Sequence, residues 1–254
     1  MSDILFACDL DNTLLYSHKV ALPEEKICAE YYLGHEQSFL TRRTVELLKK
    51  VRKKTIFVPI TTRSLEQYRR IIWPQGLEPK SALAANGAIM LEGGEPEPIW
   101  QEESRQKFSR YTEVLEDLRQ RIIKDYPEIN CRMVDGSYLF LAAADSSSAE
   151  RLAAQIAAPS SVSVEVSGRK IYFLPPELDK GATLRRLQKL LNPSTTFAAG
   201  DSSLDVPMLN SADLAFFLGE RLPPKIEAHS ALCIDDFPGS EKLLEEILKR
   251  LTKF

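Results

Sequence analysis

Two carboxylates stand two residues apart at the end of a short apolar segment near the start of the chain, in the run Phe6-Ala7-Cys8-Asp9-Leu10-Asp11-Asn12-Thr13-Leu14. Ile4 to Cys8 is apolar throughout and too short for a helix, which predicts a parallel strand buried on both faces. Side chains two residues apart in an extended chain point to the same side. One carboxylate can then act as a nucleophile while its neighbour carries a proton. A turn is the competing interpretation, because Asp and Asn also favour strand ends.

Two further strands are predicted to end in polar residues. The first, Thr55 to Ile60, ends in Thr61-Thr62-Arg63. It contains Pro59, which cannot donate to a central ladder and therefore indicates an edge strand or a bulge. The second, Thr195 to Ala199, breaks into Gly200-Asp201-Ser202-Ser203-Leu204-Asp205, which places two more acids at a strand end.

A helix is predicted to begin at Asp179-Lys180-Gly181, because Leu184, Leu187 and Leu191 follow at helical spacing. Asp179 is the natural N-cap of this helix. Lys180 lies at the positive end of the helix dipole, where a cation is slightly unfavourable. This lysine is therefore either solvated or held in place to meet an anion.

In this order, the four segments resemble the four motifs of the haloacid dehalogenase (HAD) superfamily of phosphatases. Thr61-Thr62-Arg63 and Asn86-Gly87-Ala88 add similarity to members with a large C2-type cap, which include sucrose-phosphate, mannosyl-phosphoglycerate and Cof-like sugar phosphatases. The resemblance implies an α/β fold, in which a doubly wound, Rossmann-like parallel-sheet core carries an inserted α+β cap domain. It also implies a phosphatase that hydrolyses a small phosphomonoester, most simply a sugar phosphate.

The resemblance assigns a role to each matched catalytic residue. Asp9 would attack the substrate phosphorus, and Asp11 would protonate the leaving alcohol before activating a water. Thr61 and Lys180 would hold the transferring group, whose charge is spread over its equatorial oxygens. Lys180 would also keep Asp9 ionised.

The same resemblance implies one bound Mg²⁺, a hard cation that prefers oxygen ligands. Its ligands would be Asp9, the backbone carbonyl of Asp11 and Asp201, with Asp205 as a further ligand or a support. Leu204 precedes Asp205 where many relatives carry Asn, so one supporting hydrogen bond is expected to be missing.

Substrate recognition is predicted at the edges of the matched motifs and in the cap. Thr62, Arg63 and Asn86 are the candidates in the core, and Thr62 replaces the usual Gly. The cap candidates, whose orientation the sequence leaves open, are Arg132, Tyr138, Glu165, Arg169, Lys170 and Tyr172.

More than a hundred residues separate the second and third motifs, which is too long for a normal connection and predicts a separate domain. We expect residues 1–86 and 176–254 to form the core and residues 87–175 to form the cap. The cap is expected to be a sheet with helices on one face. The long connection from Tyr16 to Phe39 is either a flap, with Tyr16, His18 or Arg43 near the substrate, or a solvated loop.

Composition narrows the classes of partner. The 254 residues carry a net charge of −3 with interspersed signs, so neither nucleic acid nor an anionic membrane surface is an expected partner. No apolar run approaches the roughly 18 residues of a membrane span. A cytoplasmic protein acting on a small phosphorylated metabolite is therefore predicted, with its oligomeric state open.

Two alternatives remain at this stage. A phosphomutase of the same fold could return the phosphoryl group to another hydroxyl of the substrate. A regulatory or binding protein could keep the fold without turnover, although clustered acids cost stability unless a cation offsets them.

Overall fold

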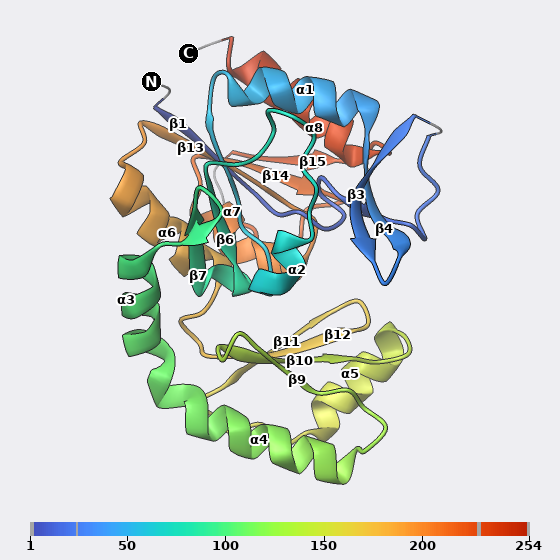
Figure 1. Ribbon diagram of the computed structural model, residues 1–254, viewed down its shortest axis with the longest axis vertical. Helices are drawn as coiled ribbons and strands as arrows, with labels where there is room; N and C mark the ends of the chain where they lie inside the picture. The colour runs from blue at the N-terminus through green and yellow to red at the C-terminus, as the bar shows by residue number, and fades with distance from the viewer. Residues whose placement is uncertain (1–2, 24, 228–229, 253–254) are drawn as a thin grey trace.

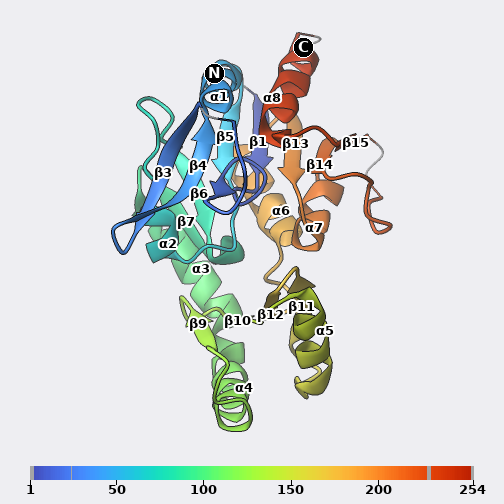
Figure 2. The same ribbon diagram turned by 90° about the vertical axis from the view of Figure 1, so that its right-hand side faces the viewer.

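The computed structural model describes residues 3–23, 25–227 and 230–252. It has two lobes, a larger core and a smaller cap below it (Figures 1 and 2). Across the described residues, we find no helix with the length and apolar character needed to cross a membrane.

Within the described residues, the sheet at the centre of the core has five parallel strands. In spatial order they are β15 (Ala231–Ile234), β14 (Leu214–Leu218), β13 (Thr195–Gly200), β1 (Ile4–Cys8) and β5 (Ile56–Pro59). β1 lies in the middle, with Ala7 opposite Ala198 on one side and Val58 on the other. β5 lies at the edge of this sheet, which agrees with the position expected from Pro59.

Helices cover both faces of the central sheet, so the predicted doubly wound core is confirmed (Figure 1). One face carries α1 (Arg42–Arg52) and α8 (Gly239–Arg250), and the other carries α6 (Lys180–Leu191) and α7 (Val206–Asn210). Successive side chains of β1 point to opposite faces of the sheet and so contribute to both layers of core packing. Phe6 packs in the cluster that contains Leu48 of α1, and Leu5 packs in the cluster that contains Leu184 of α6.

The connection after the first motif folds as an antiparallel sheet, so the solvated-loop alternative is wrong. Its strand order is β2 (Tyr16–Ser17), β4 (His35–Thr41) and β3 (Lys26–Tyr32). Leu33 and Gly34 form the turn between β3 and β4, with φ of +51° and +80°. Positive φ at both central residues is the requirement of a tight hairpin turn. Ala29 and Leu40 anchor the hairpin in the core.

The chain approaches the cap through a second small antiparallel sheet and a helix. In chain order this region comprises α2 (Leu65–Arg69), β6 (Ser81–Ala84), the 3₁₀ turn η1 (Ala85–Gly87), β7 (Ile89–Glu92), β8 (Glu95–Pro96) and α3 (Pro98–Phe108). β7 pairs with β6 and its apolar side chains join the core clusters. The domain boundaries expected at residues 86 and 175 stay predictions.

The cap is an antiparallel sheet with two helices on one face (Figure 1). Its strand order is β11 (Ser163–Ser167), β12 (Lys170–Leu174), β10 (Tyr138–Ala142) and β9 (Arg132–Val134). The 3₁₀ turn η2 (Ser109–Tyr111) leads into α4 (Thr112–Asp125), and α5 (Ser146–Gln155) follows β10. Leu139 and Phe173 pack beneath these helices, whereas Tyr138 and Tyr172 belong to the cluster on the core side. The predicted α+β cap is therefore confirmed.

Candidate active site

The four predicted segments meet at the carboxyl edge of the central sheet. Asp9 directly follows β1, Asp201 directly follows β13, and Thr61 follows β5. Lys180 is the first residue of α6. The amide of Asp9 donates to the carbonyl of Ala199 at 2.9 Å, so the strand pairing continues to the first carboxylate. Parallel strands bring these side chains together because their carboxyl ends share one edge.

Lys180 is buried and bound by two carboxylates. Its Nζ donates to Asp9 Oδ1 and to Asp205 Oδ1, each at 2.5 Å, and the residue is 2% exposed. Burial alone would lower the pKa of Lys180, but Asp205 and Asp9 outweigh it and raise the pKa above its ordinary value. Asp179 caps α6, as expected, by accepting from the amides of Gly181 and Ala182. Of the two alternatives for Lys180, the lysine held by anions is the one observed.

Three carboxylates surround this single ammonium. Asp9, Asp201 and Asp205 each offer an oxygen atom within 4.8 Å of the others. Burial, the largest influence, raises the pKa of Asp9 well above its ordinary value; Lys180 opposes this rise, and the nearby carboxylates of Asp205 and Asp201 add to it. Burial and Asp205 also raise the pKa of Asp201 to about 6. A hard divalent cation fits this donor set, because oxygen ligands and uncompensated negative charge are what such an ion needs.

Asp205 and Asp201 differ in how far their oxygens are already engaged. Asp205 is fully buried, and its Oδ2 accepts from the amide of Ser202 at 2.9 Å and from its hydroxyl at 2.7 Å. Asp201 is more open, and accepts longer hydrogen bonds from Asn12 Nδ2 at 3.3 Å and Thr13 Oγ1 at 3.4 Å. Asp201 is thus the more available ligand, and Asp205 fixes the loop and Lys180.

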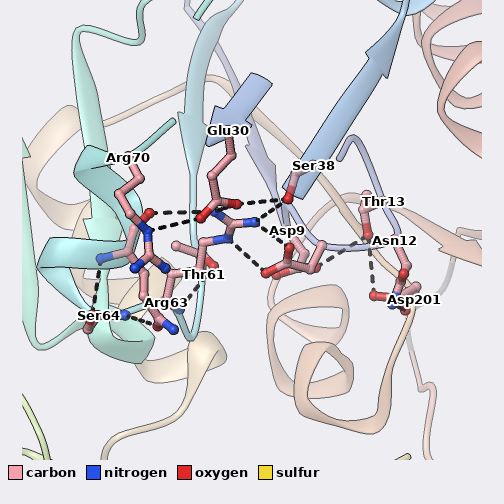
Figure 3. A network of polar contacts seen from close by, with 12 residues as sticks. Asp9, Asn12, Thr13, Glu30, Ser38, Thr61, Arg63, Ser64, Arg70 and Asp201 are labelled. Atoms are coloured by element: carbon pink, nitrogen blue, oxygen red, sulfur yellow. Dashed lines mark hydrogen bonds and ion pairs between the residues drawn. The ribbon is translucent and has the colours of Figure 1, made fainter. Parts of the chain in front are cut away.

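Asp11 is bound by Arg63, whose contact with Glu30 is drawn in Figure 3. Arg63 donates from Nε to Asp11 Oδ2 at 3.0 Å and from Nη2 to Asp11 Oδ1 at 2.8 Å. Its Nη1 also donates to Glu30 Oε2 at 2.9 Å. Burial would raise the pKa of Asp11, but the nearby cations, first Arg63 and then Lys170 and Lys180, together lower it. Arg63, predicted to bind substrate, is therefore bound to the candidate acid in this structure.

The threonines and Asn86 contribute in different ways. Thr61 is fully buried, and its Oγ1 accepts from the amide of Arg63 at 3.1 Å, so its hydroxyl proton is free to be donated elsewhere. The carbonyl of Thr62 accepts from Tyr138 Oη at 2.5 Å, which joins core and cap. Asn86 is buried and donates from Nδ2 to the carbonyl of Leu178 at 2.8 Å. Substrate contacts of Thr62, Arg63 and Asn86 stay predictions.

A cleft of about 530 Å³ lies between the core and the cap and includes Asp11 and Thr62 in its lining. Among the cap candidates, five line this cleft and Glu165 does not; the five are Arg132, Tyr138, Arg169, Lys170 and Tyr172. The volume is within the usual range of sites for small molecules.

The hairpin between β3 and β4 contributes a buried acid that was not predicted from the sequence. Glu30 on β3 is 1% exposed and accepts from Ser38, Arg63 and Arg70. The signal that could have revealed this hairpin is Leu33-Gly34 between two segments rich in aromatic and β-branched residues.

Of the three side chains proposed for a flap over the site, one lines the cleft. His18 does so, whereas the hydroxyl of Tyr16 accepts from the amide of Ser240 at 3.0 Å and Arg43 pairs with Glu245 at 3.2 Å. Tyr16 therefore joins β2 to α8, and Arg43 joins α1 to α8.

Buried acids and a buried lysine at the carboxyl edge of a doubly wound sheet, beneath an inserted cap, define a phosphatase of the HAD superfamily. More narrowly, the chain belongs to the sucrose-6F-phosphate phosphohydrolase family, whose match extends over residues 2–233. A search of curated protein sequences finds no match.

Solved structures share this fold at low sequence identity. The sucrose-phosphatase of Synechocystis, solved with sucrose and phosphate, aligns with a TM-score of 0.62 and 18% identity over 98% of each chain. The trehalose-6-phosphate phosphatase of Aspergillus fumigatus aligns with a TM-score of 0.53 and 17% identity over 96% of this chain and 92% of that one. A HAD phosphatase of Bacteroides thetaiotaomicron aligns with a TM-score of 0.54 and 13% identity over 97% of this chain and 95% of that one.

Proposed function

We propose that this chain is a cytoplasmic, Mg²⁺-dependent phosphomonoester hydrolase that acts through an aspartyl-phosphate on a sugar phosphate or a similar small metabolite. The observation that carries the proposal is the environment of Asp9. Its carboxylate is 6% exposed, bound by Lys180 at 2.5 Å, and surrounded by further acids within 4.8 Å. A cluster of buried carboxylates of this kind lowers the stability of the fold and is therefore typical of a functional site that binds a cation and an anionic substrate.

In the first step, a carboxylate oxygen of Asp9 forms a bond to the substrate phosphorus while the bond from phosphorus to the leaving oxygen breaks. Asp11 gives its proton to that leaving oxygen, and the alcohol departs. The lowered pKa of Asp11 favours its ionised form in the free protein. A bound phosphate dianion nearby raises that pKa, because like charge disfavours ionisation, and so helps Asp11 to carry the proton.

In the second step, Asp11 takes a proton from a water that attacks the phosphorus of the aspartyl-phosphate. The bond between phosphorus and Asp9 breaks, inorganic phosphate leaves, and Asp9 is restored. The buried hydroxyl of Thr61 and the ammonium of Lys180 hold the phosphoryl oxygens through both steps, and Thr62, Arg63 and Asn86 are the proposed substrate contacts in the core.

Asp9, Asp201 and the backbone carbonyl of Asp11 would hold the Mg²⁺, with Asp205 behind them as a support. When bound, the ion supplies positive charge that relieves the repulsion between a carboxylate and an anionic phosphate. The oxygen donors and the raised pKa of Asp201 support this assignment.

A sugar phosphate is the proposed substrate class because the family and two of the structural relatives are named for phosphatases of phosphorylated disaccharides. The aromatic rings of Tyr138, Phe140 and Tyr172 line the cleft, and the centroid of the Tyr172 ring lies 6.2 Å from that of Tyr138 and 5.5 Å from that of Phe140. They offer an apolar surface between polar groups, as sites for small organic molecules commonly do.

The test is phosphate release from a panel of sugar phosphates, nucleotides and an aryl phosphate, with Mg²⁺ or with EDTA. Asp9→Asn is the blank, since it keeps the shape of the side chain and removes the nucleophile. We expect turnover that needs the metal and is lost in Asp9→Asn. Hydrolysis in ¹⁸O-labelled water should place one label in the released phosphate.

Two results would point to the alternatives. A requirement for a bisphosphate activator, with the label absent from the product, would indicate a phosphomutase. No phosphate release by folded protein that binds phosphomonoesters would indicate a binding role.

A further inference from the structure

The cleft between core and cap carries an excess of positive charge. Its basic side chains are Lys19, Arg63, Arg70, Arg132, Arg169 and Lys170, and its acidic ones are Asp11 and Glu30. The chain as a whole has a net charge of −3, so this excess is a property of the cleft and not of the protein surface in general.

Both acids of the cleft are already neutralised by the two arginines of the core. Asp11 pairs with Arg63 at 2.8 Å, and Glu30 pairs with Arg63 at 2.9 Å and with Arg70 at 3.0 Å. The remaining positive charge comes mainly from the cap, at Arg132, Arg169 and Lys170. No acid in the cleft lining is left over to balance these three side chains.

Lys170 and Arg132 have no carboxylate partner among the described residues. Lys170 begins β12 and is partly buried, and its charge contributes, after Arg63, to the lowered pKa of Asp11. Arg132 lies on β9 with its guanidinium 4.9 Å from the centroid of the Phe140 ring, so the cap sheet holds it over an aromatic face. Arg132 itself is exposed, whereas Lys170 is a partly buried cation without a carboxylate partner in the described part of the chain, which is unfavourable until an anion binds.

These cap cations belong to a different lobe from the groups that serve the transferred phosphate. The phosphoryl oxygens are proposed to meet Thr61 and Lys180, which belong to the core, are both buried and are not among the residues that line the cleft. Asp11, the proposed acid for the leaving oxygen, lines the same cleft as Lys170 and Arg132, so a leaving group that extends from Asp11 into this cleft would meet these two cations.

We propose that the preferred substrate carries a second anionic group on its leaving alcohol, a carboxylate or a second phosphate, which Lys170 and Arg132 of the cap bind. The inference rests on the proposed phosphatase activity and narrows its substrate class. The inference distinguishes this chain from a phosphatase whose substrates have uncharged sugar leaving groups, because an uncharged leaving group would form no ion pair with the cations of the cap.

Matched substrates test the proposal. Glycerol 3-phosphate and 3-phosphoglycerate, both open chains, differ by a carboxylate alone. 6-Phosphogluconate differs from glucose 6-phosphate by a carboxylate and by its open chain, and glucose 1,6-bisphosphate differs from glucose 6-phosphate by a second phosphate. We expect kcat/KM to be about tenfold or more higher for the doubly anionic member of each pair, the effect of one good ion pair. The compound with the larger increase in kcat/KM, the carboxylate or the second phosphate, identifies the anionic group that the cap recognises.

Variants locate the preference. Lys170→Met and Arg132→Gln should each lower kcat/KM for 6-phosphogluconate several-fold more than for glucose 6-phosphate. Lys124→Met, which removes an exposed lysine of α4 outside the cleft, should change neither. Equal hydrolysis of both members, or equal losses for both in the Lys170 variant, would overturn the inference and leave the phosphatase activity standing.

A binding measurement separates failure of the inference from failure of the proposed activity. Calorimetry on Asp9→Asn with Mg²⁺ compares 6-phosphogluconate with glucose 6-phosphate without turnover. Tighter binding of the acid, lost in the double variant with Lys170→Met, supports the inference even if the wild type releases no phosphate. Equal affinities overturn it whatever the activity.

Discussion

Arg63 and Asp11 form a bidentate ion pair, with Nε and Nη2 of the guanidinium donating to the two carboxylate oxygens at 3.0 and 2.8 Å. The same guanidinium reaches Glu30 at 2.9 Å, so the hairpin of β3 and β4 supports the position of the candidate acid. A bidentate pair fixes geometry as well as charge. The orientation and the pKa of Asp11 therefore depend on a residue far from it in the sequence.

Arg63→Gln should shift the pH–rate profile to higher pH. Burial raises the pKa of Asp11 and Arg63 is the cation that opposes burial most strongly, so removal of the guanidinium should raise this pKa. Asp11 is proposed to act first as an acid and then as a base. Whichever limb of the pH–rate profile reports the pKa of Asp11 should therefore move to higher pH. Profiles of kcat/KM and kcat measure the shift. Arg69→Gln, which removes an exposed arginine of α2, should leave the profile in place, and a profile unchanged in Arg63→Gln would contradict the coupling.

Glu30→Gln should destabilise the protein by about 3–5 kcal/mol, the usual cost of removing one partner of a buried ion pair. Glu30 is 1% exposed and neutralises Arg63 and Arg70. Urea unfolding measures the loss. Glu66→Gln removes a more exposed carboxylate that lies 3.6 Å from the same Arg70, and should cost no more than about 0.5 kcal/mol. Similar losses in the two variants would refute the structural role given to Glu30.

Asp201→Asn should stabilise the metal-free protein at pH 7. The pKa of Asp201 is about 6 in the folded protein, above its value in the unfolded chain. Ionisation of Asp201 therefore lowers the free energy of unfolding progressively as the pH rises from about 4 to 6, and by a constant amount above pH 6. A shift of this size corresponds to roughly 2–3 kcal/mol. Thermal melts in EDTA should show a higher Tm for the variant.

The same melts test the metal. Mg²⁺ should raise the Tm of the wild type and have little effect on Asp201→Asn, because the variant lacks a proposed ligand. Asp117→Asn makes the same change of charge at an exposed site on α4 and should respond to Mg²⁺ as the wild type does. Equal Mg²⁺ shifts in wild type and Asp201→Asn would remove Asp201 from the ligand set.

Tyr138→Phe should weaken the hold of the cap on the core. The hydroxyl of Tyr138 donates to the carbonyl of Thr62 at 2.5 Å, and its loss leaves that carbonyl without this donor at a cost of about 1–3 kcal/mol. We expect kcat/KM to fall about tenfold, which corresponds to 1.4 kcal/mol. Tyr126→Phe, at the end of α4, should change kcat/KM less than about twofold. Equal effects of the two variants would show that the contact between Tyr138 and Thr62 does not matter for turnover.

The local elements of the core follow from the sequence with little ambiguity. Ile4 to Cys8 forms β1 with the predicted bounds, because a short apolar run between polar residues is typical of a buried strand. Asp179 caps α6 as predicted, since the capping requirement is local. The hairpin of β3 and β4 was missed because its anchors, Ala29 and Leu40, are buried by tertiary packing while much of the rest stays exposed.

The sequence by itself determined which residues follow the strands of the central sheet, and therefore that Asp9, Thr61 and Asp201 lie at one edge. Periodicity and strand ends are local properties, and parallel strands align their carboxyl ends. Only the tertiary structure decided that Arg63 binds Asp11 and Glu30, and that Lys170 faces the cleft while Glu165 does not. Ion pairs and cleft linings join residues from separate elements, so their geometry is set by packing between those elements.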